Sequence, residues 1–449
     1  MSGSIVQAVA RIKRNVAEFL TAESIVEVCR ESGHTWRERE LGPAATVWAF
    51  LLQVLHGNTS CAHVVRLAQL RSSAEAYCAA RARLPLAALE RLLERTTSVA
   101  RSGCGEPRWH GHRTFFADGS GCSMPDTAEL QNYFGQPGQQ RRGCGFPQAH
   151  LLAMFDAATG LIVKLLAAPL RTHDQSQVTQ LHPELAAGDV LVADRGFASY
   201  VHLALIVERN LHAVFRAHQR QLVSFRCDRR LSGAQARGTV ARRANSRLVR
   251  KLGRFDQLVE YTKPPQGPDW MEAGAFAALP EKIVVRELRY RTGVRGFRSR
   301  AITLVTTLLS AEQYPAAELA ALYRRRWEIE TNFAHLKTTM RMDVLRCQSV
   351  PGVLKELAMF ALVYNLVRLV MLTAARTMEV PVERLSFVDA LRWLAQASAQ
   401  QPILAIRVNR LRPNRCEPRV RKRRPKEYTL MNAPRRQLRE QLLAQRLNA

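Results

Sequence analysis

Three acidic residues of the sequence lie in contexts where their carboxylates could bind a metal ion. Asp118 lies in FFADGSG and Asp194 in VLVADRGF, so each ends an apolar run and has a glycine one or two residues later. Glycine allows a ligand or another backbone segment to approach closely. An aspartate that ends a strand is also a common turn residue, so each site alone has a purely structural explanation. Glu330, in a segment of helical pattern, completes a set of three acids that favours a functional site.

All three side chains offer oxygen as the ligand atom. Mg²⁺ and Mn²⁺ prefer such ligands, and two of these ions can clamp the attacking and leaving oxygens of a phosphodiester. A zinc site is the alternative, with Cys104, His110, His112 and Cys122 as its candidate ligands. Their spacing fits no standard zinc pattern. The sequence therefore favours Mg²⁺ or Mn²⁺, as two ions, on the three carboxylates.

The segment 322–340, LYRRRWEIETNFAHLKTTM, must position Glu330. It contains neither Gly nor Pro, and its apolar residues recur at the spacing of a single helix. At about 100° per residue they form one narrow stripe that should pack on a core. This apolar stripe consists of Leu322, Ile329, Phe333, Leu336 and Met340. The far side of the helix is expected to face solvent, and it carries Arg324, Glu328, Asn332 and His335.

A second stripe, about 60° wide, runs beside the apolar one. It holds Tyr323, Arg326, Glu330 and Lys337. One acid, two bases and a phenol therefore line the edge of the buried face, where a cleft would lie. The alternative is that Arg326 and Glu330 form only an ion pair between residues four apart, which contributes roughly a few tenths of a kcal/mol.

The whole chain is strongly basic. Its 449 residues include 66 Lys and Arg against 38 Asp and Glu, which gives a formal net charge of +28 and a pI near 10.7. Such a charge indicates a polyanionic partner, most simply nucleic acid. An anionic membrane is the alternative, but no apolar run reaches about 18 uncharged residues. Nine scattered cysteines, an odd number, indicate reduced thiols in a cytosolic compartment.

Residues 1–108 have the pattern of a helical N-terminal domain. Apolar periodicity runs through 5–30, 44–55, 61–70 and 85–99, and glycines and other breakers separate these segments. Two roles remain open for this domain. It could bind DNA ends, or it could only support the domain that follows.

After residue 108 the sequence changes to short apolar runs rich in β-branched and aromatic residues, which predict strands. These runs are 114–118, 151–156, 161–165, 189–194 and 213–216, with a helix expected at 199–208. The run 189–194 is continuously apolar, as expected for a central strand buried on both faces. Three strands followed by strand–helix alternation predict an α/β fold, with a mixed sheet and flanking helices.

A β-rich basic insertion is expected at 220–310, between two parts of this core at 109–219 and 311–385. Residues 220–254 hold eleven Lys or Arg, and strand-like runs follow at 283–290 and 301–309. A helix is expected at 353–375. The C-terminal region, 386–449, is basic, and 419–426 has six bases in eight positions. Such runs are usually solvated tails, and DNA contact is their second use. The candidate DNA contacts in these two basic segments are Arg242, Arg243, Arg421 and Arg423.

The spacing Tyr323-x2-Arg326-x3-Glu330-x6-Lys337 resembles the Tyr-Arg-Glu-Lys signature of bacterial DDE transposases of the insertion-sequence-four type. DGSGCSMPDT is similar to the first-aspartate motif of that family, and GDVLVADRGF to its second. The resemblance covers nearly the whole chain. It implies a ribonuclease-H-like core, with a helical region before it and a β-rich insertion between the second aspartate and the glutamate.

The resemblance implies a metal-dependent enzyme that cuts the ends of an insertion sequence and joins them to target DNA. Asp118, Asp194 and Glu330 would be its catalytic metal ligands. The residues that would hold DNA phosphates near the cut are Tyr323, Arg326 and Lys337. Its partner would be double-stranded DNA, both the terminal inverted repeats and the target. The protein would act as a homodimer in the synaptic complex and would be a cytoplasmic, nucleoid-associated bacterial protein.

The chain departs from the family at one position. Some members place a Trp just after the second aspartate motif, where it stacks on an extruded base, whereas this chain has Phe197 and Tyr200. A hairpin intermediate is therefore left open. Two other functions also remain open. One is a transposase-derived DNA-binding protein without cleavage activity, and the other is a plain ribonuclease-H-like nuclease, for which the insertion and the Tyr-Arg-Glu-Lys helix would be extra parts.

Overall fold

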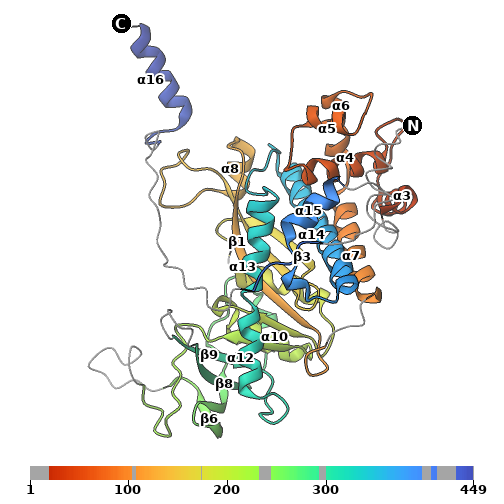
Figure 1. The fold of residues 1–449 in the computed structure, drawn as a ribbon. Coiled ribbons are helices and arrows are strands. Elements are labelled where there is room, and N and C mark those ends of the chain that lie inside the picture. Colours follow the sequence, from red (N-terminus) through yellow and green to blue (C-terminus); the bar gives the residue numbers. More distant parts are fainter. Residues whose placement is uncertain are drawn as a thin grey trace.

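A nine-stranded mixed sheet runs through the protein in the order β3-β2-β1-β4-β5-β9-β8-β7-β6 (Figure 1). The computed structural model describes residues 20–103, 108–172, 174–231, 244–292, 300–396, 406–411 and 431–447. Strands β1, β4 and β5 pair in parallel, and the other pairs are antiparallel. The strands are β1 Thr114–Ser123, β2 Gln148–Asp156, β3 Ile162–Pro169, β4 Val190–Ala193, β5 His212–Arg216, β6 Arg247–Gly253, β7 Asp256–Thr262, β8 Lys282–Thr292 and β9 Arg300–Thr306.

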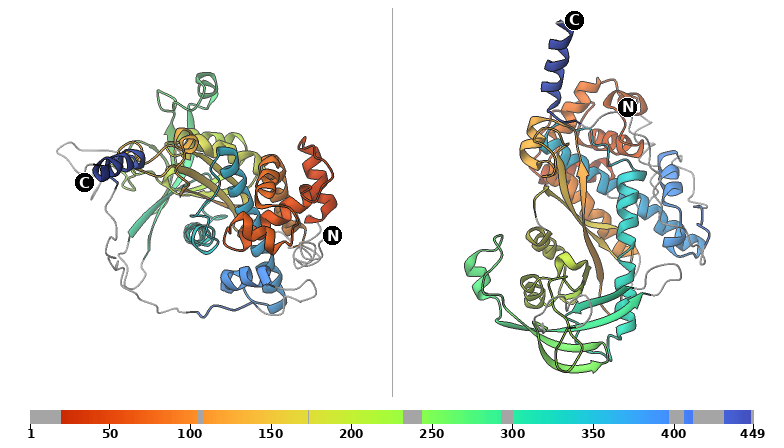
Figure 2. Two further views of the ribbon diagram at one scale, coloured as in Figure 1. Left: turned by 90° about the horizontal axis from the view of Figure 1, so that it is seen from above. Right: turned by 90° about the vertical axis from the view of Figure 1, so that its left-hand side faces the viewer.

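Alternating side chains of the central strands enter two separate cores, one on each face of the sheet. Phe116 and Val192 belong to one core, whereas Phe115 and Leu191 belong to the other. This alternation follows from the two-residue period of a strand. The first core contains the long helix α14 (Val350–Met378), and the second contains α10 (Tyr200–Glu208). Helices therefore cover both faces (Figure 2), which confirms the predicted α/β class.

Helix α14 passes through the first core and is almost entirely buried. Ser349 caps its start by accepting a hydrogen bond from the Gly352 amide at 3.3 Å. Among the described residues, it is the one helix long and apolar enough to cross a membrane, yet most of its apolar window lies inside the protein. Its buried Asn365 side chain bonds to both the amide and the carbonyl of Ile162 on β3. These contacts identify α14 as a core helix.

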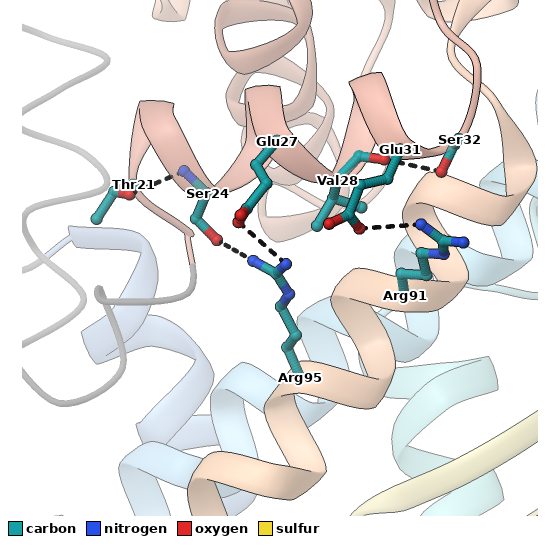
Figure 3. Close-up of polar contacts among 8 residues, drawn as sticks. All are labelled: Thr21, Ser24, Glu27, Val28, Glu31, Ser32, Arg91 and Arg95. Atoms are coloured by element: carbon teal, nitrogen blue, oxygen red, sulfur yellow. Dashed lines mark hydrogen bonds and ion pairs between the residues drawn. The ribbon is translucent and has the colours of Figure 1, made fainter.

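The N-terminal segment forms the helices α3 (Ala22–Glu31), α4 (Pro43–Leu55), α5 (Cys61–Leu67), α6 (Ala74–Arg83) and α7 (Leu86–Gly103). Figure 3 shows α3 against α7, where Arg91 pairs with Glu31 at 3.0 Å and Arg95 with Glu27 at 3.2 Å. Such exposed pairs contribute less than about 1 kcal/mol each. Fully buried residues of α3, such as Ile25 and Val28, therefore dominate this contact. The pattern expected at 5–30 lies partly outside the described residues.

The basic insertion continues the core sheet. Strand β9 pairs with β5 in antiparallel register, and β8, β7 and β6 follow outward (Figure 2). The fully buried Arg286 of β8 donates to both carboxylate oxygens of Asp256 at 2.8 and 2.5 Å. It also donates to the carbonyl of Tyr314 at 2.7 Å, just before helix α12 (Ala316–Arg325). A short helix, α11 (Ala273–Ala278), lies between β7 and β8.

The described C-terminal residues include α15 (Phe387–Gln396), preceded by the short helix η6 (Val382–Arg384). Buried α15 residues such as Phe387 pack in the first core beside α14. Helix α16 (Arg435–Leu447) projects away from the body of the protein (Figure 1). Its Leu442 and Leu443 are exposed.

Candidate functional site

Asp118 and Asp194 lie side by side because their strands are parallel neighbours in register. Ala117 of β1 pairs with Ala193 of β4, so the aspartates occupy the next position on each chain. Alternation from Phe116 places the Asp118 side chain on the face of the first core. Burial raises the pKa of Asp118, and the nearby Asp194 carboxylate raises it further. The sheet thus brings together two of the three predicted acids.

The predicted helix 322–340 is interrupted. It consists of α12, α13 (Glu328–Ala334) and a π turn at His335–Thr339. At the junction, the amides of Arg326 and Trp327 bond to carbonyls three residues earlier, at 3.1 and 3.2 Å. These bonds tighten one turn, as in a 3₁₀-helix. The expectation of one uninterrupted helix was therefore wrong in detail, although the two helices adjoin along the segment (Figure 1).

The apolar stripe of this segment is buried as expected. Its five residues, from Leu322 to Met340, are each at most 7% exposed. The expectation that the far side faces solvent was wrong for Asn332, which is buried, and for His335, which stacks on Phe387 with the ring centroids 4.2 Å apart. Helix α15 supplies Phe387 and covers this side. Burial lowers the pKa of His335 to about 4.

Arg326 bonds mainly to the sheet. Its Nη1 donates to Asp118 Oδ2 at 2.7 Å, whereas its Nη2 lies 4.0 Å from Glu330 Oε1. The Arg326 side chain is 11% exposed and that of Glu330 is 50% exposed. The interactions of Arg326 are therefore not limited to an ion pair with Glu330 along one helix. Its guanidinium joins the helical segment to the first aspartate, with Glu330 at the outer edge.

Tyr323 completes the contacts between the helical segment and the two aspartates. Its hydroxyl lies 3.5 Å from Asp194 Oδ1, and Arg326 lies over its ring. Burial raises the pKa of Tyr323 above its usual range. The phenol is therefore protonated at neutral pH and can donate a hydrogen bond.

Lys337, the last residue of the second stripe, reaches β1 beyond Asp118. Its Nζ donates to Ser120 Oγ and to the Gly121 carbonyl, both at 2.5 Å. Burial lowers the pKa of Lys337. The structure thus brings together five of the six predicted site residues around β1, β4 and α12, with Glu330 beside Arg326 at the solvent edge.

The chemistry of these donors fits a hard divalent cation. Asp118 and Asp194 present carboxylates to one face, and burial raises the pKa of Asp118 even though the neighbouring Arg326 guanidinium acts to lower it. Within the described ranges, no group of three or more His, Cys, Asp or Glu is already gathered as a metal site. Consistent with this, Arg326 binds Asp118 and the Glu330 side chain is half exposed.

The zinc alternative receives no support from its described members. His110 pairs with Glu318 at 2.5 Å, and His112 lies 2.7 Å from the Tyr314 hydroxyl. Cys122 is buried near the Met342 carbonyl. Cys104 lies outside the described residues. The three described side chains therefore have separate partners.

Sequence reasoning missed two polar residues behind the aspartates. His150 of β2 and Asp174, the first residue of α9 (Asp174–Val178), are joined by a 2.6 Å contact between Nε2 and Oδ1. A Cβ atom on Gly119 would lie only 2.7 Å from Asp174 Oδ1. The glycine directly after Asp118 was the available signal, because it indicates close approach by another group.

The two aromatic residues after the second aspartate motif already have contacts within the protein. Phe197 is 1% exposed, and the Tyr200 hydroxyl donates to the Pro280 carbonyl. Trp327, between Arg326 and α13, is 58% exposed. It is therefore the aromatic side chain of the helical segment that a nucleic acid can reach. The predicted DNA contacts Arg242, Arg243, Arg421 and Arg423 lie outside the described residues.

Comparisons with known proteins give one family and several relatives. Residues 109–366 match the family described as transposase DDE domain. Transposase InsG for insertion sequence element IS4, from Escherichia coli strain K12, is 24% identical over 371 residues, covering 80% of this chain and 77% of the relative. Putative transposase InsZ from the same strain is 28% identical over 186 residues, covering 38% and 58%. The cryo-EM structure of the piggyBac transposase synaptic complex with hairpin DNA aligns with a TM-score of 0.44 at 11% identity, covering 85% of this chain and 78% of that one.

Proposed function

Because the chain belongs to the transposase DDE domain family, we propose that it is a DNA transposase that cuts the ends of an insertion sequence and joins them to target DNA. The observation that carries this proposal is the position of Asp118 and Asp194 at equivalent points of two parallel strands. Arg326, which contacts Asp118, comes just before the helix α13 that carries Glu330. The matched residues 109–366 include all three acids.

The strand order supports the finer description of the fold as a ribonuclease-H-like core. Strands β1, β4 and β5 are parallel and central, and β2 and β3 continue from β1. In this description, residues 109–219 and 311–385 form the core. Residues 220–310 form the β-rich insertion, 1–108 the helical N-terminal domain and 386–449 the basic C-terminal region.

We assign the metal-binding role to Asp118, Asp194 and Glu330, with Mg²⁺ or Mn²⁺, as two ions, as the cofactor. When bound, these ions would stabilise the charge that develops on the phosphate during cleavage. The half-exposed side chain of Glu330 can turn toward the aspartates from the edge of the site. Arg326 is the counter-charge of Asp118 in the structure.

The basic residues of the site are assigned to DNA phosphates. A guanidinium presents its N–H groups in a fork that matches phosphate oxygens. Within the described structure, Arg326 Nε is buried without a hydrogen-bond partner, so it can donate to a phosphate once the guanidinium turns toward one. Tyr323 offers a protonated hydroxyl and Lys337 an ammonium group on either side of Arg326. Together they would fix the phosphate that is cut relative to the acids.

Double-stranded DNA is the proposed partner, and the formal charge of +28 supports it. Affinity of such a protein for DNA should fall steeply with salt, because bound phosphates release counterions. We further propose a homodimer in the synaptic complex and a cytoplasmic, nucleoid-associated location. The alternative of a DNA-binding protein without cleavage activity is disfavoured, because all three acids and the Tyr-Arg-Lys set are present.

Cleavage of a labelled terminal repeat by the purified full chain tests the function. With Mg²⁺ or Mn²⁺, the wild-type protein should nick this DNA. Asp118→Asn, Asp194→Asn and Glu330→Gln should reduce the rate by orders of magnitude, since each ~1.4 kcal/mol of lost transition-state stabilisation is tenfold. The three variants should still bind the same DNA in gel shifts.

Glu328→Gln is the matched control. Glu328 lies one half-turn from Glu330 on the same helix and pairs with Arg325 at 2.9 Å. Its variant should cut DNA at nearly the wild-type rate. Near-normal nicking by folded Glu330→Gln protein would overturn the proposed mechanism.

A further inference from the structure

Asp174 and His150 form a polar pair on the side of the sheet opposite Arg326. His150 faces Gly121 across the β1–β2 ladder, and its Nε2 lies 2.6 Å from Asp174 Oδ1. The His150 side chain is 18% exposed and that of Asp174 is 27% exposed. The pair is therefore shielded from bulk water on most of its surface.

The pair fills space that two glycines leave open. A Cβ on Gly119 would lie 2.7 Å from Asp174 Oδ1 and 3.1 Å from His150 Cε1. A Cβ on Gly196 would lie 3.5 Å from Asp174 Oδ2. Gly119 directly follows Asp118, and Gly196 is the second residue after Asp194. One carboxylate thus packs against both aspartate-bearing segments.

The sheet separates this pair from the proposed metal-binding face. Phe115 and Ala117 point into the second core, and alternation places Gly119 on that same side. Asp118 points the other way, toward Arg326. Asp174 and His150 therefore support the aspartates from behind.

The segment after Asp194 depends on contacts from α9. Strand β4 has only four residues, and a three-residue 3₁₀ turn, η3 (Arg195–Phe197), follows it. No side chain caps that turn. Gln175, next to Asp174, donates to the Gly196 carbonyl at 3.0 Å. Asp174 and Gln175 together hold this turn against β1 and β2.

We propose that Asp174 and His150 are positioning residues that fix the Asp118 and Asp194 segments at the separation needed for metal-dependent cleavage. This inference rests on the proposed function. Its physical basis is that a displacement of about 1 Å at a catalytic group can reduce a rate about a hundredfold. Neither side chain is assigned contact with metal or DNA.

Asp174→Ala and Asp174→Asn distinguish positioning from direct metal binding. Asparagine keeps an oxygen that accepts the His150 N–H, so it should retain at least about a third of the wild-type nicking rate. Alanine removes both the acceptor and the packing, and it should slow nicking about tenfold to a hundredfold. Equal large losses in the two variants would overturn the inference in favour of direct metal binding.

Hydrogen exchange of the metal-free protein gives a readout independent of activity. In Asp174→Ala, the amides of residues 118–121 and 195–198 should exchange faster, because their local opening becomes easier. The amides of β2 and α14 should exchange at the wild-type rate. Unchanged exchange in both segments would contradict the inference.

Asp189→Asn is the matched control. Asp189 accepts two bonds from Arg113, at 2.8 and 2.5 Å, and this pair joins the starts of the same two strands, β1 and β4. Its loss should lower the unfolding temperature without accelerating exchange at 118–121 or 195–198. Failure of the proposed function would appear separately, as continued nicking by Glu330→Gln.

Gly119→Ala provides a second route to the same displacement. The new methyl group would meet Asp174 Oδ1 at 2.7 Å and push the carboxylate away. It should slow nicking in the wild-type background and have a smaller additional effect in Asp174→Ala. Full additivity of the two losses would contradict a shared cause.

Discussion

Arg326 Nη1 lies 2.7 Å from Asp118 Oδ2, which is closer than its Nη2 lies to Glu330 Oε1, four residues along the same segment, at 4.0 Å. The guanidinium therefore compensates the charge of a strand aspartate. A divalent cation bound at Asp118 would be a second positive charge next to Arg326.

Arg326→Ala should destabilise the metal-free protein by about 2 kcal/mol, because Asp118 would lose a charged hydrogen-bond partner. Added Mg²⁺ should then raise the unfolding temperature of the variant more than that of the wild type, since the cation replaces the missing charge. Thermal unfolding with and without Mg²⁺ measures both effects. Arg324→Ala, an exposed neighbour, is the control and should change neither value. Equal Mg²⁺ responses in wild type and Arg326→Ala would contradict this account.

Lys337→Ala should weaken binding of the terminal repeat, whereas Glu330→Gln should leave it intact or improve it. The Lys337→Ala variant loses a phosphate contact, which should reduce the slope of log affinity against log salt concentration by about one. The glutamine variant removes a negative charge near the phosphate. Gel shifts at several salt concentrations compare the two. The same salt slope in Lys337→Ala and wild type would exclude the phosphate contact.

Trp327 should stack on an unpaired base near the cut. Base–aromatic stacking contributes about 1–3 kcal/mol, as measured by alanine substitution. Trp327→Ala should therefore weaken binding of a terminal repeat with an unpaired end by roughly tenfold or more, and Trp327→Phe should recover part of the loss. A fully paired DNA end is the control substrate. Equal effects on both substrates would indicate a role other than stacking.

Stability should fall on acidification below about pH 6.5. Burial lowers the pKa to about 3 for His182 and about 4 for His202 and His335. Between pH 6.5 and 4 the unfolded chain therefore binds more protons, so the free energy of unfolding falls as pH falls and is fully recovered above the unfolded pKa. Each histidine contributes at most about 1.4 kcal/mol per pH unit.

His335→Phe tests one of these contributions while keeping the ring stack on Phe387. Urea unfolding between pH 5 and 7 should give a shallower pH dependence for this variant, by up to one proton. An unchanged slope would show that His335 titrates alike in the folded and unfolded chains.

Local patterns were sufficient to predict the aspartates and the apolar stripe. The apolar run before Asp194 identifies a strand end, and the helical period identifies the buried face of 322–340. These features depend on residues near in sequence. The strands between 114 and 216, and helix α14, also lie where the sequence predicts them, for the same reason. The expectation that Asp118 also ends a strand was wrong, because β1 continues through Asp118 to Ser123, where it still pairs with β2.

Contacts between distant segments were not predictable in this way. His335 was expected in solvent because the sequence does not reveal that Phe387 covers it. The tightened turn at Arg326 and the pair of Asp174 with His150 likewise arise from packing between elements. In the sequence, the glycine next to Asp118 was the one signal that another group approaches closely there.

Helix α14 has a consequence for synthesis of the protein on the ribosome. It is made after the N-terminal helices, the sheet strands and all three acids, yet it fills the core between the sheet and helix α7. Until Val350–Met378 has emerged, the apolar faces of α7, β2 and β3 cannot be buried. Exposed apolar surface of this kind makes nascent chains prone to aggregate and dependent on chaperones. A chain that stops before residue 350 would thus carry every proposed catalytic residue and still fail to accumulate as a folded nuclease.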